Sequence, residues 1–104
     1  MREKNYYRAV LEFSHALDVN PKDAQAAFYL RKTYDEQDKV IKELNMAAAR
    51  DIESLHYQRA IVSYCSILRL LYNFKQDKRY QEAVEKIFEV EEKIGKEKGE
   101  TKCN

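Results

Sequence analysis

Apolar residues recur every three or four positions along most of the chain, which is the spacing that places them on one face of an α-helix. The first such stripe starts at Tyr6 and stops before Asn20 and Pro21. Similar stripes predict further helices over about 21–36, 38–52, 54–75 and 78–94. The pattern therefore predicts an all-α chain of about five helices without a strand.

Residues that begin or end helices separate these stripes. Asn20 is placed to cap the second helix, and Pro21 suits its first turn, where its missing N–H leaves no partner unsatisfied. Asp35–Asp38 is a polar break of the length expected between antiparallel helices. Asp77 is placed to cap the last helix, which ends at Gly95.

The stretch 38–74 contains no residue that forces a helix to stop. One unbroken helix over this stretch would be about 55 Å long, which is more than an ordinary domain of this size uses. We therefore divide it near 52–54, with Ser54 or Asp51 as the cap of the following helix.

The composition fits a single helical domain. Of the 104 residues, 44% are apolar and 36% are charged, with only 2 glycines and 1 proline. We assign 1–95 to this domain and 96–104 to a polar tail, which has too little apolar surface to fold and is expected to be disordered. The predicted core consists of Ala9, Phe13, Ala16, Leu30, Tyr34, Ala60, Ile67, Leu71, Ala83 and Ile87.

The charge balance argues against two classes of partner. The 19 basic residues nearly cancel the 18 acidic residues and leave a net charge of +1. Because nucleic-acid binders collect a basic excess on one face, no nucleic-acid partner is predicted. No apolar run approaches the length of about 20 residues that crosses a bilayer, so no membrane insertion is predicted.

The two cysteines stand in different surroundings. Cys65 lies inside an apolar helical stripe, whereas Cys103 lies in the polar tail. A disulfide between them is one alternative, but a thiol in a helix and a thiol in a tail more often stay free, and free thiols are predicted. Free thiols favour a reducing compartment such as the cytoplasm.

A pattern of small, large and small residues recurs on the helices. Ala9, Phe13 and Ala16 form it first, and the unit of Tyr, two residues, Ala and an apolar residue starts at Tyr6, Tyr57 and Tyr80. A small residue lets two helix backbones approach each other, and a large residue one turn later fills the groove between them. Stacked helical hairpins need such an arrangement.

These residues resemble the tetratricopeptide repeat (TPR) family. Ala9, Phe13, Ala16 and Pro21 have the spacing A-x3-F-x2-A-x4-P of the second helix of its motif and the closing proline. The first-helix pattern of the next repeat is matched by Ala27, Leu30 and Tyr34. The resemblance implies antiparallel hairpins stacked as a short α-solenoid of about two and a half divergent repeats.

Several positions depart from the family pattern. Ala27 stands where the motif has tryptophan, and Arg31 stands where it has glycine, so the second hairpin is expected to be splayed or packed differently. Ala9, Ala60 and Ala83 do not follow the repeat length of the family. The chain also opens inside a second helix, which suggests a fragment of a longer protein.

The resemblance implies a protein-interaction module, an adaptor or scaffold that binds a partner peptide or helix in a groove. In the family the first helix of each repeat lines this groove. Phe28 and Tyr29 are adjacent large aromatics on such a helix, and Tyr29 is expected to point away from the apolar face. The partner-binding residues implied in this way are Gln25, Phe28, Tyr29, Lys32, Arg69 and Tyr72.

No catalytic or metal-binding pattern accompanies this surface. His15 and His56, the only histidines, have no neighbours at metal-site spacing, and no phosphate-binding glycine loop is present. We therefore predict no enzyme activity, no cofactor, no metal and no catalytic residue.

Two other interpretations stay open. In the first, the chain is a structural helical fragment that packs on its own longer protein or forms a homodimer through exposed helix edges. In the second, 40–95 alone form a three-helix bundle of the trafficking type, with Tyr57 and Ala60 near the start of its middle helix.

Overall fold

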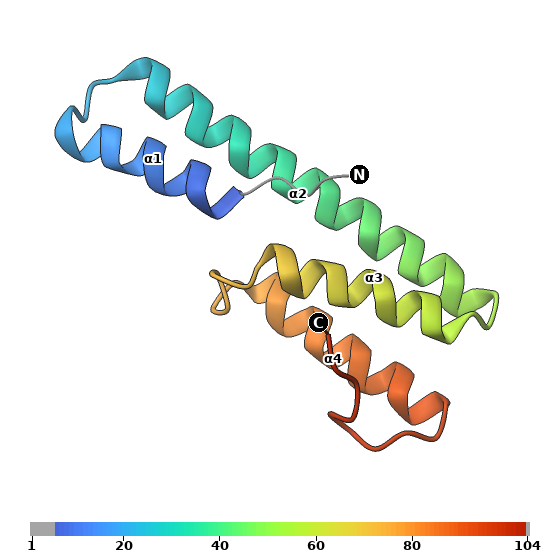
Figure 1. Cartoon of the computed structure of the whole chain (residues 1–104). Coiled ribbons are helices and arrows are strands. Elements are labelled where there is room, and N and C mark those ends of the chain that lie inside the picture. Colours follow the sequence, from blue (N-terminus) through green and yellow to red (C-terminus); the bar gives the residue numbers. More distant parts are fainter. Residues whose placement is uncertain (1–5, 104) are drawn as a thin grey trace. The chain divides into compact units, whose positions relative to one another are not determined.

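The computed structural model describes residues 6–103. Within this range the regular secondary structure consists of α-helices, without a β-strand. The helices are α1 (Tyr6–Val19), α2 (Ala24–Glu53), α3 (Tyr57–Leu70) and α4 (Lys78–Lys93) (Figure 1). The predicted all-α class is confirmed for these residues, which form four helices rather than about five. Residues 1–5 and 104, which the predicted domain and tail include, lie outside the described residues.

The predicted break at Asp35–Asp38 is wrong, because α2 continues through it. The helix has 30 residues and is therefore about 45 Å long. The break contains only Asp, Glu and Gln. Glu and Gln are good helix formers and Asp weakens a helix only slightly, whereas Gly or Pro would disfavour it strongly. Gln37 is also buried, with only 2% of its surface exposed, so this turn of α2 has an inward face. The predicted division near 52–54 is confirmed, since α2 ends at Glu53.

The turn between α1 and α2 uses two side-chain caps. Asp23 caps α2, because its Oδ1 accepts the N–H of Ala26 at 3.0 Å. Asn20 Oδ1 accepts the N–H of Lys22 at 3.2 Å and so closes the turn. The prediction that Asn20 caps α2 is therefore wrong, because the turn containing Pro21 separates Asn20 from the helix.

The turn between α2 and α3 contains a residue in the left-handed conformation. Leu55 has φ +63°, and the N–H of the next residue, His56, donates to the carbonyl of Asp51 at 2.7 Å. This is the Schellman arrangement that ends many helices, with leucine where glycine is usual. His56 then precedes α3 without a side-chain cap, so neither Ser54 nor Asp51 fills the predicted role.

The cap predicted at Asp77 is confirmed. Its Oδ1 accepts the N–H of Arg79 at 2.9 Å, and the Arg79 guanidinium also contacts the carboxylate, with Nη2 2.7 Å from Oδ2. These contacts, the side-chain hydrogen bond first, lower the pKa of Asp77 below its ordinary value. The cap is therefore charged at neutral pH, which suits the N-terminus of α4.

The chain divides into two compact units, Met1–Val40 and Ile41–Asn104. The boundary falls inside α2, so α1 and the beginning of α2 belong to the first unit. The remainder of α2 belongs to the second unit, together with α3 and α4. Each unit has its own buried residues.

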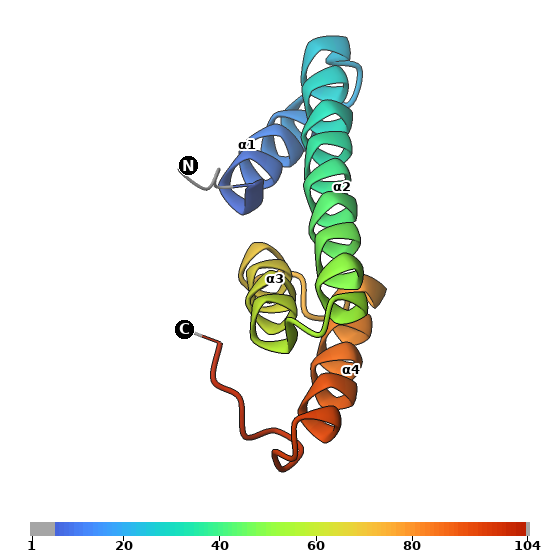
Figure 2. The same cartoon turned by 90° about the vertical axis from the view of Figure 1, so that its right-hand side faces the viewer.

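The second unit has an extensive apolar core. Figures 1 and 2 both show α3 beside α4 and beside the second half of α2. The helices bury Ile41, Ala48, Ala60, Ile61, Tyr64, Cys65, Ile67, Leu71, Ala83, Ile87 and Val90 in one cluster. All five predicted core residues from this unit, Ala60, Ile67, Leu71, Ala83 and Ile87, are confirmed. Among its described residues, this unit contains three helical segments, the number that the three-helix interpretation of 40–95 predicts. The trafficking function attached to that interpretation stays a prediction.

The first unit is a helical hairpin with a smaller core. Its α1 runs antiparallel to the beginning of α2 (Figure 1). Tyr6, Val10 and Ala26 are buried, whereas Tyr34 is 43% exposed, so its predicted place in the core is wrong. The buried face of α2 is centred on Ala26 and Gln37, which lie three turns apart, and Tyr34 falls beside it. The predicted core residues Ala9, Phe13, Ala16 and Leu30 are half-buried.

Candidate interaction site

Three aromatic side chains meet at the edge of the hairpin in the first unit. The rings of Phe13 on α1 and Tyr29 on α2 are stacked, with centroids 5.7 Å apart and planes 19° apart. The rings of Phe28 and Tyr29 form a T-shaped pair, with centroids 5.3 Å apart and planes 77° apart. Phe28 is nevertheless 57% exposed. We call Phe13, Phe28 and Tyr29 the aromatic cluster.

A shallow concavity adjoins the aromatic cluster near the turn between α1 and α2. Its volume is about 300 Å³, and it is lined by Phe13, Ala16, Asp23, Gln25, Ala26 and Tyr29. The side chains of Ala16 and Ala26 are small and therefore leave space next to the rings of Phe13 and Tyr29. Because Asp23 is engaged in capping α2, apolar contacts dominate what this concavity offers to a ligand.

The concavity brings together only part of the predicted binding residues. Gln25 and Tyr29 line it, and Phe28 contacts Tyr29 at its border. Lys32 is exposed and does not line it. Tyr29 was predicted to point away from the apolar face; its side chain is 39% exposed, and its ring also stacks on Phe13 of α1.

The other two predicted binding residues belong to the second unit. Arg69 is exposed on α3, and its Nη2 donates to Ser66 Oγ at 3.0 Å. Tyr72 follows α3 and is 62% exposed, with Lys75 Nζ 4.4 Å from the centroid of its ring. These two residues belong to that unit and do not line the concavity of the first unit.

The C-terminal segment, residues 96–103, forms a connection that the sequence analysis did not predict. It returns past α4 to α3 (Figure 1), where Cys103 forms a disulfide with Cys65. The Cα atoms of the two cysteines are 5.1 Å apart, and 38 positions separate them in the sequence. The prediction of free thiols is therefore wrong, and residues 96–103 have a defined course where a disordered tail was expected.

Glu91 fixes the path of the C-terminal segment. Its side chain is fully buried, and Oε1 accepts the N–H of Gly99 at 2.9 Å while Oε2 accepts the N–H of Thr101 at 2.7 Å. The backbone carbonyl of Glu91 also accepts the N–H of Lys96 at 2.9 Å, which ends α4. Gly95, with φ +77°, permits this reversal, so the predicted helix end at Gly95 is confirmed.

The electrostatics of Glu91 favour its ionised form. Burial by itself raises the pKa of this carboxyl group, but hydrogen bonds from Thr101 and Gly99 and the charge of Lys96 lower it by more. The net result is a pKa below the ordinary value of 4.5. At neutral pH the carboxylate is therefore charged and holds two backbone N–H groups.

We expect acid to loosen the C-terminal segment at Gly99 and Thr101, while the disulfide still tethers it. Since the pKa of Glu91 is lowered in the folded state, its stabilising contribution is complete above the ordinary value of 4.5 and is lost as the pH falls through the lower folded value. In an NMR titration, the amide shifts of Gly99 and Thr101 should move together with a midpoint below 4.5, and Glu91→Gln should remove this transition. A common midpoint above 4.5 would contradict the assigned hydrogen bonds.

One signal in the sequence could have indicated this role of Glu91. The apolar stripe of α4 runs through Ala83, Ile87 and Val90, and Glu91 is one turn beyond Ile87 on the same inward side. A carboxylate at such a position needs partners, because a buried charge without hydrogen bonds is costly. The partners themselves, at Gly99 and Thr101, leave no helical or strand pattern that would reveal them.

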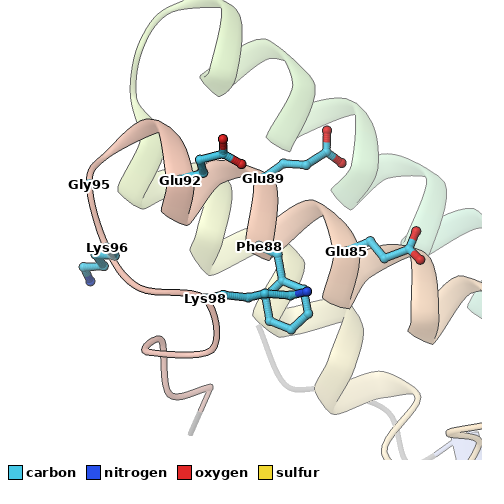
Figure 3. A pocket seen from close by; sticks show the side chains of 7 residues that line it. All are labelled: Glu85, Phe88, Glu89, Glu92, Gly95, Lys96 and Lys98. Carbon is cyan, nitrogen blue, oxygen red and sulfur yellow. The ribbon is translucent and has the colours of Figure 1, made fainter.

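A larger concavity of about 500 Å³ lies beside α4 and the start of the C-terminal segment. Lys98 lies across Phe88, with Nζ 4.9 Å from the centroid of the ring, and Lys96 points away from that ring (Figure 3). The carboxylates of Glu89 and Glu92 point away from Phe88 and do not converge on one position with the other labelled side chains (Figure 3). Among residues 6–103, no group of three or more His, Cys, Asp or Glu residues could hold a metal ion.

Comparisons with known proteins give no further assignment. No protein-family model matches the chain, and searches of curated proteins and of solved structures find no match. The resemblance to the TPR family and the stacking that it implies therefore stay predictions. In the part of the chain that the structure describes, none of the helices is both long and apolar enough to cross a membrane.

Proposed function

We propose that the chain is a protein-interaction module that binds a segment of another protein at the aromatic cluster and the adjoining concavity of the first unit. The exposure of Phe28, 57% of its surface, is the observation that carries this proposal. A large ring held in contact with a second ring offers apolar area to a partner. Aromatic residues of this kind provide much of the binding energy in protein interfaces.

The geometry of the cluster favours a ligand with an apolar anchor. Tyr29 contacts both Phe13 and Phe28, so its side chain is already held in place before a ligand binds. Binding therefore costs little additional side-chain entropy at this residue. The concavity next to the small side chains of Ala16 and Ala26 has room for one side chain of the ligand. Lys32, one turn beyond Phe28 on α2, favours an acidic residue next to that anchor.

The alternative of self-association rests on a different observation. On α1, Leu11 is 50% exposed and Val19 is 75% exposed, which gives the hairpin apolar area outside the aromatic cluster. Two copies that covered this area would form a homodimer with a self-complementary interface. Light scattering over a range of concentrations separates the two functions, since the proposed module is monomeric without its partner.

Site-specific crosslinking tests the proposed surface. We would place a photoreactive phenylalanine analogue at Phe28 and, as a matched control, at Met46, which also lies on α2 and is 59% exposed. We expect the analogue at position 28 to attach to one defined segment of a second protein, which mass spectrometry identifies, and the analogue at 46 not to do so. Equal labelling from both positions, or attachment only to a second copy of this chain, would contradict the proposal.

A further inference from the structure

An apolar groove runs between α3 and α4 in the second unit, and the C-terminal segment covers it. A cavity of about 130 Å³ remains beneath the segment. Its walls are Leu68 on α3 and Val84, Ile87 and Phe88 on α4, and its cover includes Thr101 and Cys103. The chain itself therefore supplies the occupant of this groove.

The groove holds its occupant at a turn, in which the N–H of Glu100 donates to the carbonyl of Glu97 at 3.1 Å and Gly99 has φ +86°. The N–H groups of Gly99 and Thr101, two residues apart, both donate to the carboxylate of Glu91. The turn, with Gly99 in the left-handed conformation, brings both N–H groups to the same side, so one carboxylate reaches both of them. Lys98, across the ring of Phe88, adds a contact at the entrance.

The Cys65–Cys103 disulfide determines whether the C-terminal segment stays in the groove. Ordering residues 96–103 costs conformational entropy at every position, and this segment places few apolar side chains against the groove. Two hydrogen bonds to Glu91 and one contact at the surface offset only part of that cost. The disulfide keeps Cys103 next to Cys65 and so supplies a high effective concentration of the segment at the groove.

We propose that the groove between α3 and α4 is a binding site for a polypeptide segment, that the chain's own residues 99–103 occupy it, and that the Cys65–Cys103 disulfide controls their release. While the disulfide is closed, the segment blocks the groove. When the disulfide is reduced, the segment leaves and Leu68, Val84 and Phe88 become accessible. This proposal concerns the second unit and does not depend on the function proposed for the first.

The redox step is a thiol–disulfide exchange with a dithiol reductant. A thiolate of the reductant attacks Sγ of Cys103, which is half-buried, and Cys65, which is 6% exposed, leaves as a thiolate and takes up a proton. The second thiol of the reductant then displaces Cys103 from the mixed disulfide. Two electrons and two protons pass to the cysteine pair, and the reductant becomes a disulfide.

Amide hydrogen exchange on the full chain, measured by NMR, tests the proposal. In the oxidised protein the N–H groups of Gly99 and Thr101 should be protected. After reduction by dithiothreitol their exchange should accelerate by about tenfold or more, while the core amides of α3 and α4 still exchange much more slowly than these two, with protection lowered only by the lost stabilisation of the disulfide. Fluorescence of an apolar dye should rise in the same step, because the groove becomes accessible.

Two variants make the outcome decisive. Cys103→Ser should match the reduced protein in exchange at Gly99 and Thr101 and should not respond to dithiothreitol. Glu91→Gln, with its disulfide closed, should retain a covered groove and lose part of the protection of these two amides. The proposal is overturned if the two amides stay protected after complete reduction. It is equally overturned if the amides of α3 and α4 then exchange as fast as these two, since the disulfide is then needed for the fold of the whole unit.

Discussion

Replacing Ile67 with alanine is expected to reduce the free energy of unfolding of the second unit by about 2–5 kcal/mol. Ile67 is fully buried on α3, in the cluster that joins this helix to α4 and to the second half of α2. The substitution removes apolar contacts and leaves a cavity that three packed helices fill only in part. Urea denaturation followed by circular dichroism measures the loss as a lower midpoint.

Val62→Ala is the matched control for this prediction. Val62 lies on the same helix and is 62% exposed, so its truncation should change the free energy of unfolding by less than about 0.5 kcal/mol. If the two variants unfold at the same midpoint, the assignment of the inward face of α3 is wrong.

Opening the Cys65–Cys103 disulfide should have a comparably large effect on stability. The link closes a loop over 38 positions, and the chain-entropy model gives about 4 kcal/mol of stabilisation for a loop of that length. The contribution arises mainly because the disulfide restricts the unfolded chain. We therefore expect a lower urea midpoint for the reduced protein, with the helical circular dichroism signal retained before unfolding.

Cys103→Ser provides the control for the effect of the disulfide. Its urea midpoint should equal that of the reduced protein and should be insensitive to dithiothreitol. An unchanged midpoint after reduction of the original protein would contradict the disulfide, and peptide mapping without reductant would then show Cys65 and Cys103 in separate peptides.

The parts of the fold that were predicted correctly depend on short-range chemistry. Asp77 caps α4 and Gly95 ends it because capping depends on residues within one turn. The stripe of Ala60, Ile67 and Leu71 follows directly from helical periodicity and a sharply amphipathic sequence. These features need no knowledge of the neighbouring helices.

The errors in α2 arise where local signals are weak. Asp35–Asp38 is polar without a strong helix breaker, so continuation of the helix depends on its packing, including the burial of Gln37. Tyr34 and Ala26 differ in burial because the inward face is set by α1, and several rotations of α2 would fit its evenly spread apolar residues.

The course of the C-terminal segment could not be predicted from the sequence for another reason. Its contacts join Cys103 to Cys65 and Gly99 to Glu91, and such pairings carry no periodicity. A polar composition favours disorder when only apolar burial is counted. Here a buried carboxylate and a disulfide hold the segment in place. The candidate binding residues divide similarly, since Gln25, Phe28 and Tyr29 gather locally on α2 and Arg69 and Tyr72 belong to the other unit.

The most direct test of the proposed interaction is a calorimetric titration of the segment identified by crosslinking at Phe28. Phe28→Ala should weaken its binding by about tenfold or more, since the most exposed ring of the aromatic cluster is removed while the helix is preserved. Met46→Ala, a truncation of similar exposure on the same helix, should leave the affinity unchanged, and both variants should keep their helical circular dichroism signal. Equal affinities for the original protein and Phe28→Ala would contradict the assignment of the aromatic cluster as the binding surface.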